Sequence, residues 1–227
     1  MCRMCAFAIG LTLASTLGTR AVAEDKPILE RIEWSDVWVV DADRDELPRV
    51  LLAGDSIVKG YYDSVSRALE GKASVARYAT SKFMGNPDYL AELEILLKGY
   101  DFDVIHINNG LHGWGYTEEQ YRESFPALLE SLKKCAPDAK VIWAMSTPIR
   151  KSDDLSQLDE KDVRLVERNR IAGEIMAEHE FPVNDLYTLV VDHPEYFAQD
   201  GVHFSEQGRI AQGQQVAAMV EEALGKE

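Results

Sequence analysis

Cysteine and histidine, the residues that form disulfides or bind transition metals, are scarce in this sequence of 227 residues. It has three cysteines, and two of them, Cys2 and Cys5, lie at the very start. Removal of that segment would leave Cys135 alone, so no intramolecular disulfide could form. Cys135 ends an amphipathic helical pattern, and we interpret it as a packing residue. The cysteines and the five histidines show no metal-ligand spacing, so we expect no metal.

Nucleotide-binding motifs and positive charge are also scarce. No Gly-x-Gly-x-x-Gly or Walker pattern occurs, and we expect no cofactor. The chain has 24 Lys and Arg against 39 Asp and Glu, which gives a formal net charge of -15. An acidic surface repels phosphate groups, so nucleic acid and anionic lipid are poor candidates as partners. The hydrophobic share of 46% is that of a globular protein.

Apolar runs long enough to cross a bilayer are absent from the sequence. Residues 1–23 instead have the layout of a secretory signal peptide. They contain Arg3, a short apolar stretch over 6–17 and the cleavage signal Ala21-Val22-Ala23. We therefore expect a single mature domain over 24–227 that is secreted or periplasmic and has no stable membrane insertion after cleavage. A retained N-terminal anchor is the alternative.

Short apolar runs alternate with helical patterns along most of the chain. The runs lie at residues 50–53, 75–79, 104–107, 141–145 and 183–186. Such runs suit strands that are buried on both faces of a parallel sheet. The alternation therefore predicts an α/β sandwich with a mostly parallel sheet. The polar, acidic stretch over 151–161 is predicted to be a surface loop.

Capping residues mark the starts of three helices between these strands. Asn86-Pro87 places a cap before proline at the first helical position. Thr117 and Gln120 form a capping box, and Ser205 caps the last helix. Pro126 lies within the second of these helices and predicts a kink or a later start.

Small polar and titratable residues follow the predicted strands. They are Gly54-Asp55-Ser56 after the first strand, Gly85 after the second, residues 108–112 after the third, Ser146-Thr147-Pro148 after the fourth, and residues 200–203 before the last helix. In an open parallel sheet, ligands bind at the carboxyl ends of the strands. We therefore expect these residues to form one site at a single edge of the sheet.

Ser56 is the candidate nucleophile because it follows the first strand directly and stands near a helix N-terminus. A serine needs a base, and His203 is the strongest candidate. Asp200 lies three residues before it, with Gly201 between them to allow a tight turn. The carboxylate would fix the imidazole tautomer and stabilise the imidazolium. The alternative is an ordinary turn with a capping aspartate beside a surface histidine.

The other four histidines occupy different settings. His106 lies in the middle of a strand and is predicted to be a core residue. His179 lies on a helix and His193 in a loop beside a proline, and both are predicted to be exposed. His112 follows the third strand and is the one of these four that we consider as a pocket residue.

Two segments carry a resemblance to a known family. Gly54-Asp55-Ser56-Ile57 resembles the first block of the SGNH (GDSL-type) hydrolase superfamily, and Asp200-Gly201-Val202-His203 resembles its last block. The resemblance covers about residues 49–224. It implies a three-layer α/β/α sandwich with a mostly parallel, flavodoxin-like central sheet. It also implies a serine hydrolase of ester bonds whose catalytic triad is Ser56, Asp200 and His203.

The same resemblance implies an oxyanion hole. In the family it is built from the nucleophile's N–H, a glycine N–H and an asparagine side chain, which by position are Ser56, Gly85 and Asn108. The third block departs from the commonest form, Gly-x-Asn-Asp, because this chain reads Asn-Asn-Gly-Leu-His over 108–112. Asn109 is therefore the substitute for Asn108. The further residues expected in the pocket are Asp55, Asn109 and His112.

The predicted reaction is hydrolysis of a small acyl ester, with acetyl as the leading candidate, on a carbohydrate outside the cytoplasm. The signal peptide favours this setting, and the chain has no long insertion to form an acyl-chain tunnel. Trp114 and Tyr116 lie in a loop where they could stack on a sugar. The expected partner is a small-molecule or polysaccharide ester. The alternatives are a non-catalytic glycan-binding module on the same fold, an acyltransferase and a lipid esterase.

Overall fold

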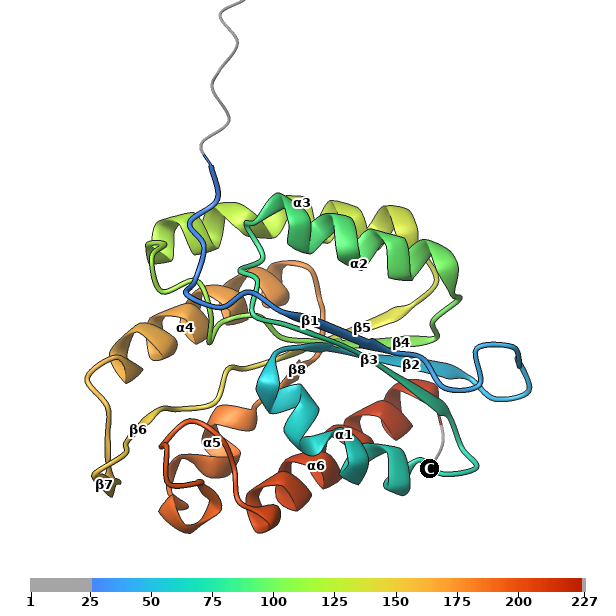
Figure 1. Ribbon diagram of the computed structural model, residues 1–227. Coiled ribbons are helices and arrows are strands. Elements are labelled where there is room, and N and C mark those ends of the chain that lie inside the picture. Colours follow the sequence, from blue (N-terminus) through green and yellow to red (C-terminus); the bar gives the residue numbers. More distant parts are fainter. Residues whose placement is uncertain (1–25, 226–227) are drawn as a thin grey trace, which may run out of the picture.

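The computed structural model describes residues 26–225, so the expected signal peptide lies outside the described residues. Helices and strands alternate along the chain (Figure 1). The strands are β1 (Ser35–Trp38), β2 (Arg49–Gly54), β3 (Ser74–Thr80), β4 (Val104–Ile107), β5 (Lys140–Ala144), β6 (Arg150–Lys151), β7 (Asp154–Leu158) and β8 (Val183–Asn184). The helices are α1 (Ser56–Ala68), α2 (Pro87–Gly99), α3 (Glu118–Cys135), α4 (Asp162–Glu178), α5 (Leu186–Val191) and α6 (Glu206–Leu224), with a 3-10 turn at Pro194–Tyr196.

The central sheet has the strand order β1-β3-β2-β4-β5-β8. The five strands from β3 to β8 are parallel, and β1 pairs antiparallel with β3 at one edge. Without β1, this is the flavodoxin-like order, in which the chain moves outward in both directions from its first strand. The predicted fold class is therefore confirmed. The edge strand β1 was not predicted from the sequence, because its four residues are mostly exposed and form no apolar run.

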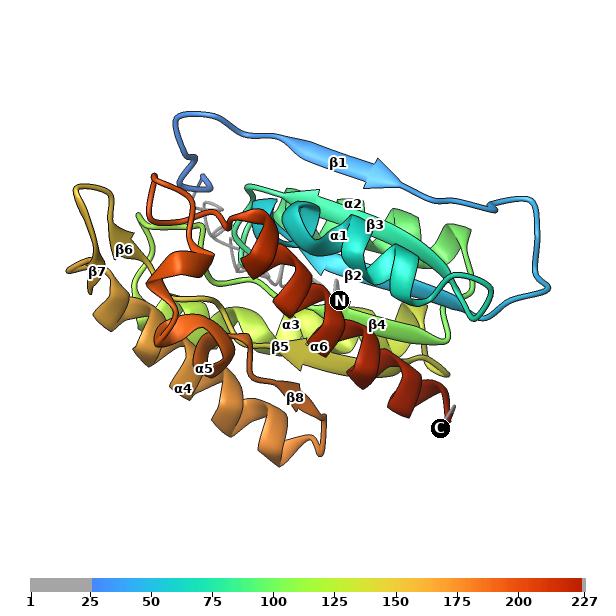
Figure 2. The same cartoon turned by 90° about the horizontal axis from the view of Figure 1, so that it is seen from below.

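Helices cover both faces of the sheet and make it a three-layer sandwich. In Figure 1 the sheet is seen from its edge, with α2, α3 and α4 on one side and α1, α5 and α6 on the other. Figure 2 looks onto the second side, where α1 and α6 lie next to each other across the sheet. Leu52 packs into the core beneath α1 and α6, whereas its neighbour Leu51 packs into the opposite core. Both faces of β2 are therefore apolar, which explains its continuous hydrophobic run.

The stretch over 151–161 corrects one prediction. It is not a plain surface loop, because β6 and β7 pair antiparallel as a short hairpin. Its residues are polar because the hairpin is largely exposed, so the pattern carries no apolar alternation. Arg150 at its base is buried, and its guanidinium donates to the carbonyl oxygens of Leu155 and Val191. These hydrogen bonds hold the hairpin against the end of α5.

Two element boundaries also differ from the sequence-based prediction. The strand expected over 183–186 ends at Asn184, because the Asp185 side chain accepts the Thr188 N–H at 2.9 Å and begins α5. Helix α3 begins directly after its capping box at Thr117 and continues through Pro126. The predicted later start of this helix is therefore wrong. Among the helices of residues 26–225, none is long and apolar enough to span a membrane.

His106 is a core residue, as predicted from its place in a strand. It is fully buried on β4, and its Nε2 accepts from the Asn184 amide at 3.0 Å. The ring packs edge-on against Tyr61, and Nδ1 has no hydrogen-bond partner among residues 26–225. Burial lowers the pKa of His106 from 6.5 to about 4. The folded protein therefore keeps this imidazole neutral at pH values where the unfolded chain protonates it.

We expect this histidine to make folding sensitive to mild acid. Between pH 6.5 and about 4 the unfolded state binds a proton that the folded state refuses, so stability is lost as the pH falls. The loss is expected to approach about 3 kcal/mol. His106→Leu should flatten the dependence of the unfolding free energy on pH in this window, as measured by urea denaturation. Equal slopes for wild type and variant would contradict the expectation.

Candidate active site

Ser56 is the first residue of α1 and is separated from the end of β2 only by Asp55. Asp55 is the N-cap of this helix, and its Oδ1 accepts the N–H of Ile57 at 2.8 Å. The strand order reverses at β2, which has β3 on one side and β4 on the other. The nucleophile candidate therefore stands at the carboxyl edge of the sheet where open α/β folds bind ligands. The unpaired N–H groups of the first helical turn also face this edge.

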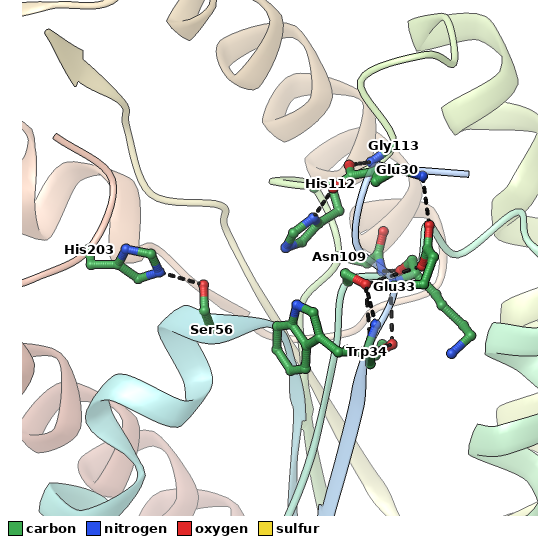
Figure 3. A network of polar contacts seen from close by, with 12 residues as sticks. Glu30, Glu33, Trp34, Ser56, Asn109, His112, Gly113 and His203 are labelled. Carbon is green, nitrogen blue, oxygen red and sulfur yellow. Dashed lines mark hydrogen bonds and ion pairs between the residues drawn. The ribbon is translucent and has the colours of Figure 1, made fainter. Parts of the chain in front are cut away.

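The structure brings Ser56, His203 and Asp200 together as the sequence predicts. His203 Nε2 lies 2.9 Å from Ser56 Oγ, and His203 Nδ1 lies 2.7 Å from Asp200 Oδ2 (Figure 3 shows the serine and the histidine). Gly201 adopts a φ of +73°, and a Cβ there would lie 2.1 Å from the Arg150 carbonyl oxygen. Only glycine fits this turn without strain. The three side chains thus form a hydrogen-bonded chain from carboxylate to hydroxyl.

Asp200 is held in its ionised form. Burial on its own would raise the pKa of Asp200, but hydrogen bonds from the His203 ring and from the backbone N–H groups of Val202 and His203 outweigh it, and the net shift is downward. Both backbone bonds are 2.9 Å long and end on Oδ1, which leaves Oδ2 for the imidazole. The carboxylate therefore fixes the proton of His203 on Nδ1. Nε2 is left as the base that faces the Ser56 hydroxyl.

Two hollows meet at the Ser56–His203 pair. One, of about 470 Å³, is lined by Trp34, Ser56, Ile57, Lys59, Gly60, His203, Phe204 and Arg209. We call it the cationic pocket. The other, of about 310 Å³, extends over Glu30, Leu111, His112, Trp114 and the base of the β6–β7 hairpin, and we call it the loop pocket. A larger hollow of about 810 Å³ lies between α3 and α4, but no triad residue lines it, so we assign the site by its chemistry.

Two of the residues implied for the oxyanion hole do not line either of these pockets. The Asn108 amide donates to the Ala144 carbonyl oxygen at 2.6 Å and to Ser146 Oγ at 3.1 Å, so both of its hydrogens are occupied. Gly85 is exposed, and a Cβ there would lie 2.6 Å from the Phe83 ring, which gives this glycine a packing reason. The oxyanion roles of Gly85 and Asn108 stay predictions.

Asn109, the substitute for Asn108, also has another task. Its Oδ1 accepts the Met84 N–H at 3.2 Å, and its Nδ2 donates to the Lys82 carbonyl oxygen at 2.9 Å. Both halves of the amide thus tie the end of β4 to the loop after β3. Asn109 lines neither pocket that contains Ser56. Asp55, also expected in the pocket, is buried beneath Ser56 as the cap of α1.

The segment before β1 contributes to the site, which the sequence pattern did not indicate. Glu30 lines the loop pocket and Trp34 lines the cationic pocket. In Figure 3, Trp34 and His112 lie on the side of Ser56 opposite His203. The segment is fastened by the Trp34 N–H, which donates to Ser81 Oγ at 2.9 Å. Neither residue belongs to a helical or alternating pattern, so long-range packing alone reveals their place.

The two aromatic residues considered as sugar platforms have different surroundings. Trp114 lines the loop pocket, where the charged ends of Lys161 and Arg168 lie 5.7 and 5.2 Å from its ring centroid. Tyr116 stacks on Phe83 with 4.2 Å between ring centroids, and its hydroxyl accepts the Ile28 N–H at 2.6 Å. Tyr116 therefore packs within the loop, whereas Trp34 and Phe204 line the cationic pocket and Trp114 lines the loop pocket.

Comparisons with known proteins agree with this fold. No family profile matches the chain, and no curated protein matches it in sequence. A lipase/acylhydrolase structure from Enterococcus faecalis is similar at a TM-score of 0.61 and 23% identity, over 78% of this chain and 96% of that one. An aryl esterase of M. smegmatis is similar at a TM-score of 0.65 and 15% identity, over 78% and 99%.

A carbohydrate acetylesterase family member from Sinorhizobium meliloti is similar at a TM-score of 0.63 and 16% identity, over 79% of this chain and 100% of that one. This chain has the SGNH hydrolase fold. The resemblance read from the first and last blocks is thus confirmed at the level of the fold.

Proposed function

We propose that this protein is a secreted serine esterase that removes small acyl groups, with acetyl as the leading candidate, from carbohydrates. The observation that carries the esterase proposal is the hydrogen-bonded chain from Asp200 through His203 to Ser56 at the carboxyl edge of the sheet. This arrangement activates a serine hydroxyl for attack on a carbonyl carbon.

The reaction follows from these groups. Ser56 Oγ attacks the ester carbonyl while its proton passes to His203 Nε2, and the imidazolium is stabilised by the Asp200 carboxylate. His203 then gives this proton to the leaving alcohol, which leaves an acyl group on Ser56. Water repeats the sequence with the same base, so the acid is released and Ser56 regains its proton. The Ser56 N–H, at the N-terminus of α1, is a fixed backbone donor beside the nucleophilic oxygen.

The preference for a small acyl group rests on the shape of the site. Asp200 and His203 have side chains that are 52% and 49% exposed, so the reacting atoms lie in an open groove. Both pockets beside Ser56 are modest in volume and carry charged residues on their walls. A long acyl chain would find little apolar surface to bury there. Trp34 and Trp114, one in each pocket, provide faces on which a sugar ring could stack.

A series of p-nitrophenyl esters tests this preference. We expect kcat/KM for the acetate to exceed that for the octanoate by about tenfold or more, because the site has no apolar channel for added methylenes. The same enzyme should release acetate from acetylated polysaccharides. A preference for chains of eight or more carbons, with no acetate released from any glycan, would favour a lipid esterase instead.

The cationic pocket gives an expectation about substrate charge. It is lined by Lys59 and Arg209 and by no acidic side chain. Asp36 pairs with Lys59 at 3.0 Å but also with Arg77 at 2.7 Å, so one carboxylate serves two cations. Arg209 forms no ion pair with any residue in 26–225. We therefore expect acetylated pectin, which carries carboxylates, to be a better substrate than neutral acetylated xylan.

Arg209→Gln should lower the ratio of pectin to xylan deacetylation by about two- to fivefold, the size expected for one exposed charge pair. Arg67→Gln is the matched control, because Arg67 lies on α1 outside both pockets. Added salt should reduce the wild-type ratio in the same direction. An unchanged ratio in the Arg209 variant would refute this expectation while leaving the esterase proposal intact.

A further inference from the structure

A second histidine–carboxylate pair lies beside the triad. Glu30 Oε2 is 2.8 Å from His112 Nδ1, and Glu30 Oε1 accepts the Gly113 N–H at 2.8 Å. Both carboxylate oxygens are therefore committed to one loop, and they keep the hydrogen of this imidazole on Nδ1. Glu30 is itself positioned by Glu33, whose side chain accepts the Glu30 N–H at 2.7 Å. Glu30 thus orients the His112 ring through a hydrogen bond to Nδ1 alone.

The other nitrogen of this ring faces the site. His112 Nε2 forms no hydrogen bond with any residue in 26–225, and the His112 side chain is 21% exposed to solvent. His112 lines the same loop pocket as Ser56 and His203. Figure 3 shows its ring pointing away from Glu30 toward the side on which Ser56 and His203 lie. Within the described part of the chain, no acceptor therefore competes for this nitrogen.

The proposed reaction requires a hydrogen-bond donor for the oxyanion in the loop pocket. The Asn108 amide, implied by the family resemblance, already donates to Ala144 and Ser146. A tetrahedral intermediate on Ser56 is better stabilised by several donors than by a single backbone N–H, because the negative charge develops on one oxygen. His112 lines the loop pocket and combines a ring nitrogen that has no hydrogen-bond partner among residues 26–225 with a ring orientation that Glu30 fixes.

We propose that His112 is a catalytic residue that donates its Nε2–H, in the protonated form of the ring, to the oxyanion formed on Ser56, and that Glu30 is the positioning residue that pairs with this imidazolium through Nδ1–H. The inference rests on the proposed esterase function and deepens it. No bond to His112 forms or breaks. The carbonyl oxygen of the ester becomes negative as Ser56 attacks, and it accepts the hydrogen bond from His112. It becomes a carbonyl oxygen again when the alcohol or the acid leaves.

The charges around His112 favour the protonated ring. Burial on its own lowers the pKa of His112, but the hydrogen bond to Glu30 and the charges of Asp55, Glu30 and Glu33 outweigh it, and the net shift is upward. Arg168 lies behind the loop and donates to the His112 carbonyl oxygen at 2.7 Å. The other titratable or charged residues that line the loop pocket are Arg150, Asp159, Lys161, Asp200 and His203.

Three variants test the assignment with p-nitrophenyl acetate as substrate. His112→Leu should lower kcat by about 100- to 1000-fold with little change in KM, because one oxyanion donor is lost. His112→Gln keeps an amide N–H near the position of Nε2, and it should recover activity to within about tenfold of wild type. The matched control is His193→Gln, since His193 forms an exposed pair with Glu195 at the same 2.8 Å outside both pockets. It should keep the wild-type rate.

The pH profile separates donation from a merely structural role. The neutral ring has its hydrogen on Nδ1 and none on Nε2, so donation ends when His112 loses its second proton. Glu30→Gln removes the charge that raises this pKa, and the descending limb of kcat/KM should therefore move to lower pH. The ascending limb of the profile, to which the Glu30–His112 pair does not contribute, should stay in place. A structural defect would instead lower the rate equally at all pH values.

Thermal melting confirms that each variant is folded. A folded His112→Leu variant within twofold of the wild-type kcat, or a Glu30→Gln profile with an unmoved descending limb, overturns the role of His112 while the esterase proposal stands. A wild-type protein that hydrolyses no ester and takes no label at Ser56 overturns the proposed function, and this inference with it.

Discussion

Replacing Ser56 with alanine is expected to reduce ester hydrolysis by about 10⁴-fold or more. Ser56 Oγ is the atom that forms the acyl bond, and no other hydroxyl of the described residues is hydrogen-bonded to His203. The remaining rate would come from the oxyanion donors and from substrate binding alone. Release of p-nitrophenol from the acetate ester, followed with the purified mature protein, measures the loss.

Ser66→Ala is the matched control for this variant. Ser66 lies on the same helix, α1, but lines neither pocket, and its removal should leave kcat/KM within about twofold of wild type. His203→Ala should lose nearly as much activity as the nucleophile variant, and the double variant should lose no more, because the two residues act as one unit. Wild-type rates in the Ser56 variant would show that the nucleophile is another residue.

Replacing Arg168 with methionine is expected to lower the free energy of unfolding by about 3 kcal/mol or more. Arg168 is fully buried on α4 and donates to the carbonyl oxygens of Gly110, His112 and Gly113 at 2.7–3.0 Å. The methionine would fill the space of the stem but leave these three acceptors unpaired. The loop after β4 carries His112 into the pocket, so activity should fall along with stability.

Arg170→Met is the control for the buried arginine. Arg170 lies two residues away on α4, is 50% exposed and pairs with Glu167 and Glu174. Exposed pairs of this kind contribute about 1 kcal/mol or less. Urea denaturation of both variants gives the comparison. Equal losses of stability in the two variants would show that the hydrogen bonds of Arg168 to the loop contribute little.

The fold and the meeting of Ser56, Asp200 and His203 at one site could be predicted because their signals are local. Apolar runs such as that of β2 report strands buried on both sides, and polar residues directly after them report the functional edge. The Asp200–His203 pair lies within a single tight turn, so the three-residue spacing is enough to predict that the two side chains meet. Ser56 required only its position after the first strand.

The remaining features depend on contacts between distant segments, which spacing does not encode. Glu30 and His112 are 82 positions apart, and neither residue type indicates the pairing. The identity of the oxyanion donor depends on which way an amide points. Asn108 was implied by its place in the third block. Its two amide hydrogens, however, are donated to the Ala144 carbonyl oxygen of strand β5 and to Ser146 Oγ. Gly85 shows the same limit, because the sequence does not distinguish a glycine that avoids a clash with an aromatic ring from one that donates to an oxyanion.

Two alternatives from the sequence analysis, a glycan-binding module and an acyltransferase, predict different outcomes in simple experiments. A glycan-binding module would bind polysaccharide without releasing acetate and without reacting at Ser56. An acyltransferase would react at Ser56 but would pass the acyl group to a sugar acceptor in preference to water. Adding a free sugar to the p-nitrophenyl acetate assay and searching by mass for the acylated sugar distinguishes transfer from hydrolysis, since fold alone does not decide between them.

The most direct measurement is covalent trapping of the nucleophile. A fluorophosphonate reacts with serines that an adjacent base has activated, and the adduct can be located by peptide mass analysis. We expect stoichiometric labelling of the wild-type protein on the peptide that contains Ser56, and none in Ser56→Ala. Labelling should also be lost in His203→Ala. A folded wild-type protein that takes up no label, or carries it on a different serine, would contradict the assignment of Ser56, His203 and Asp200 as the catalytic centre.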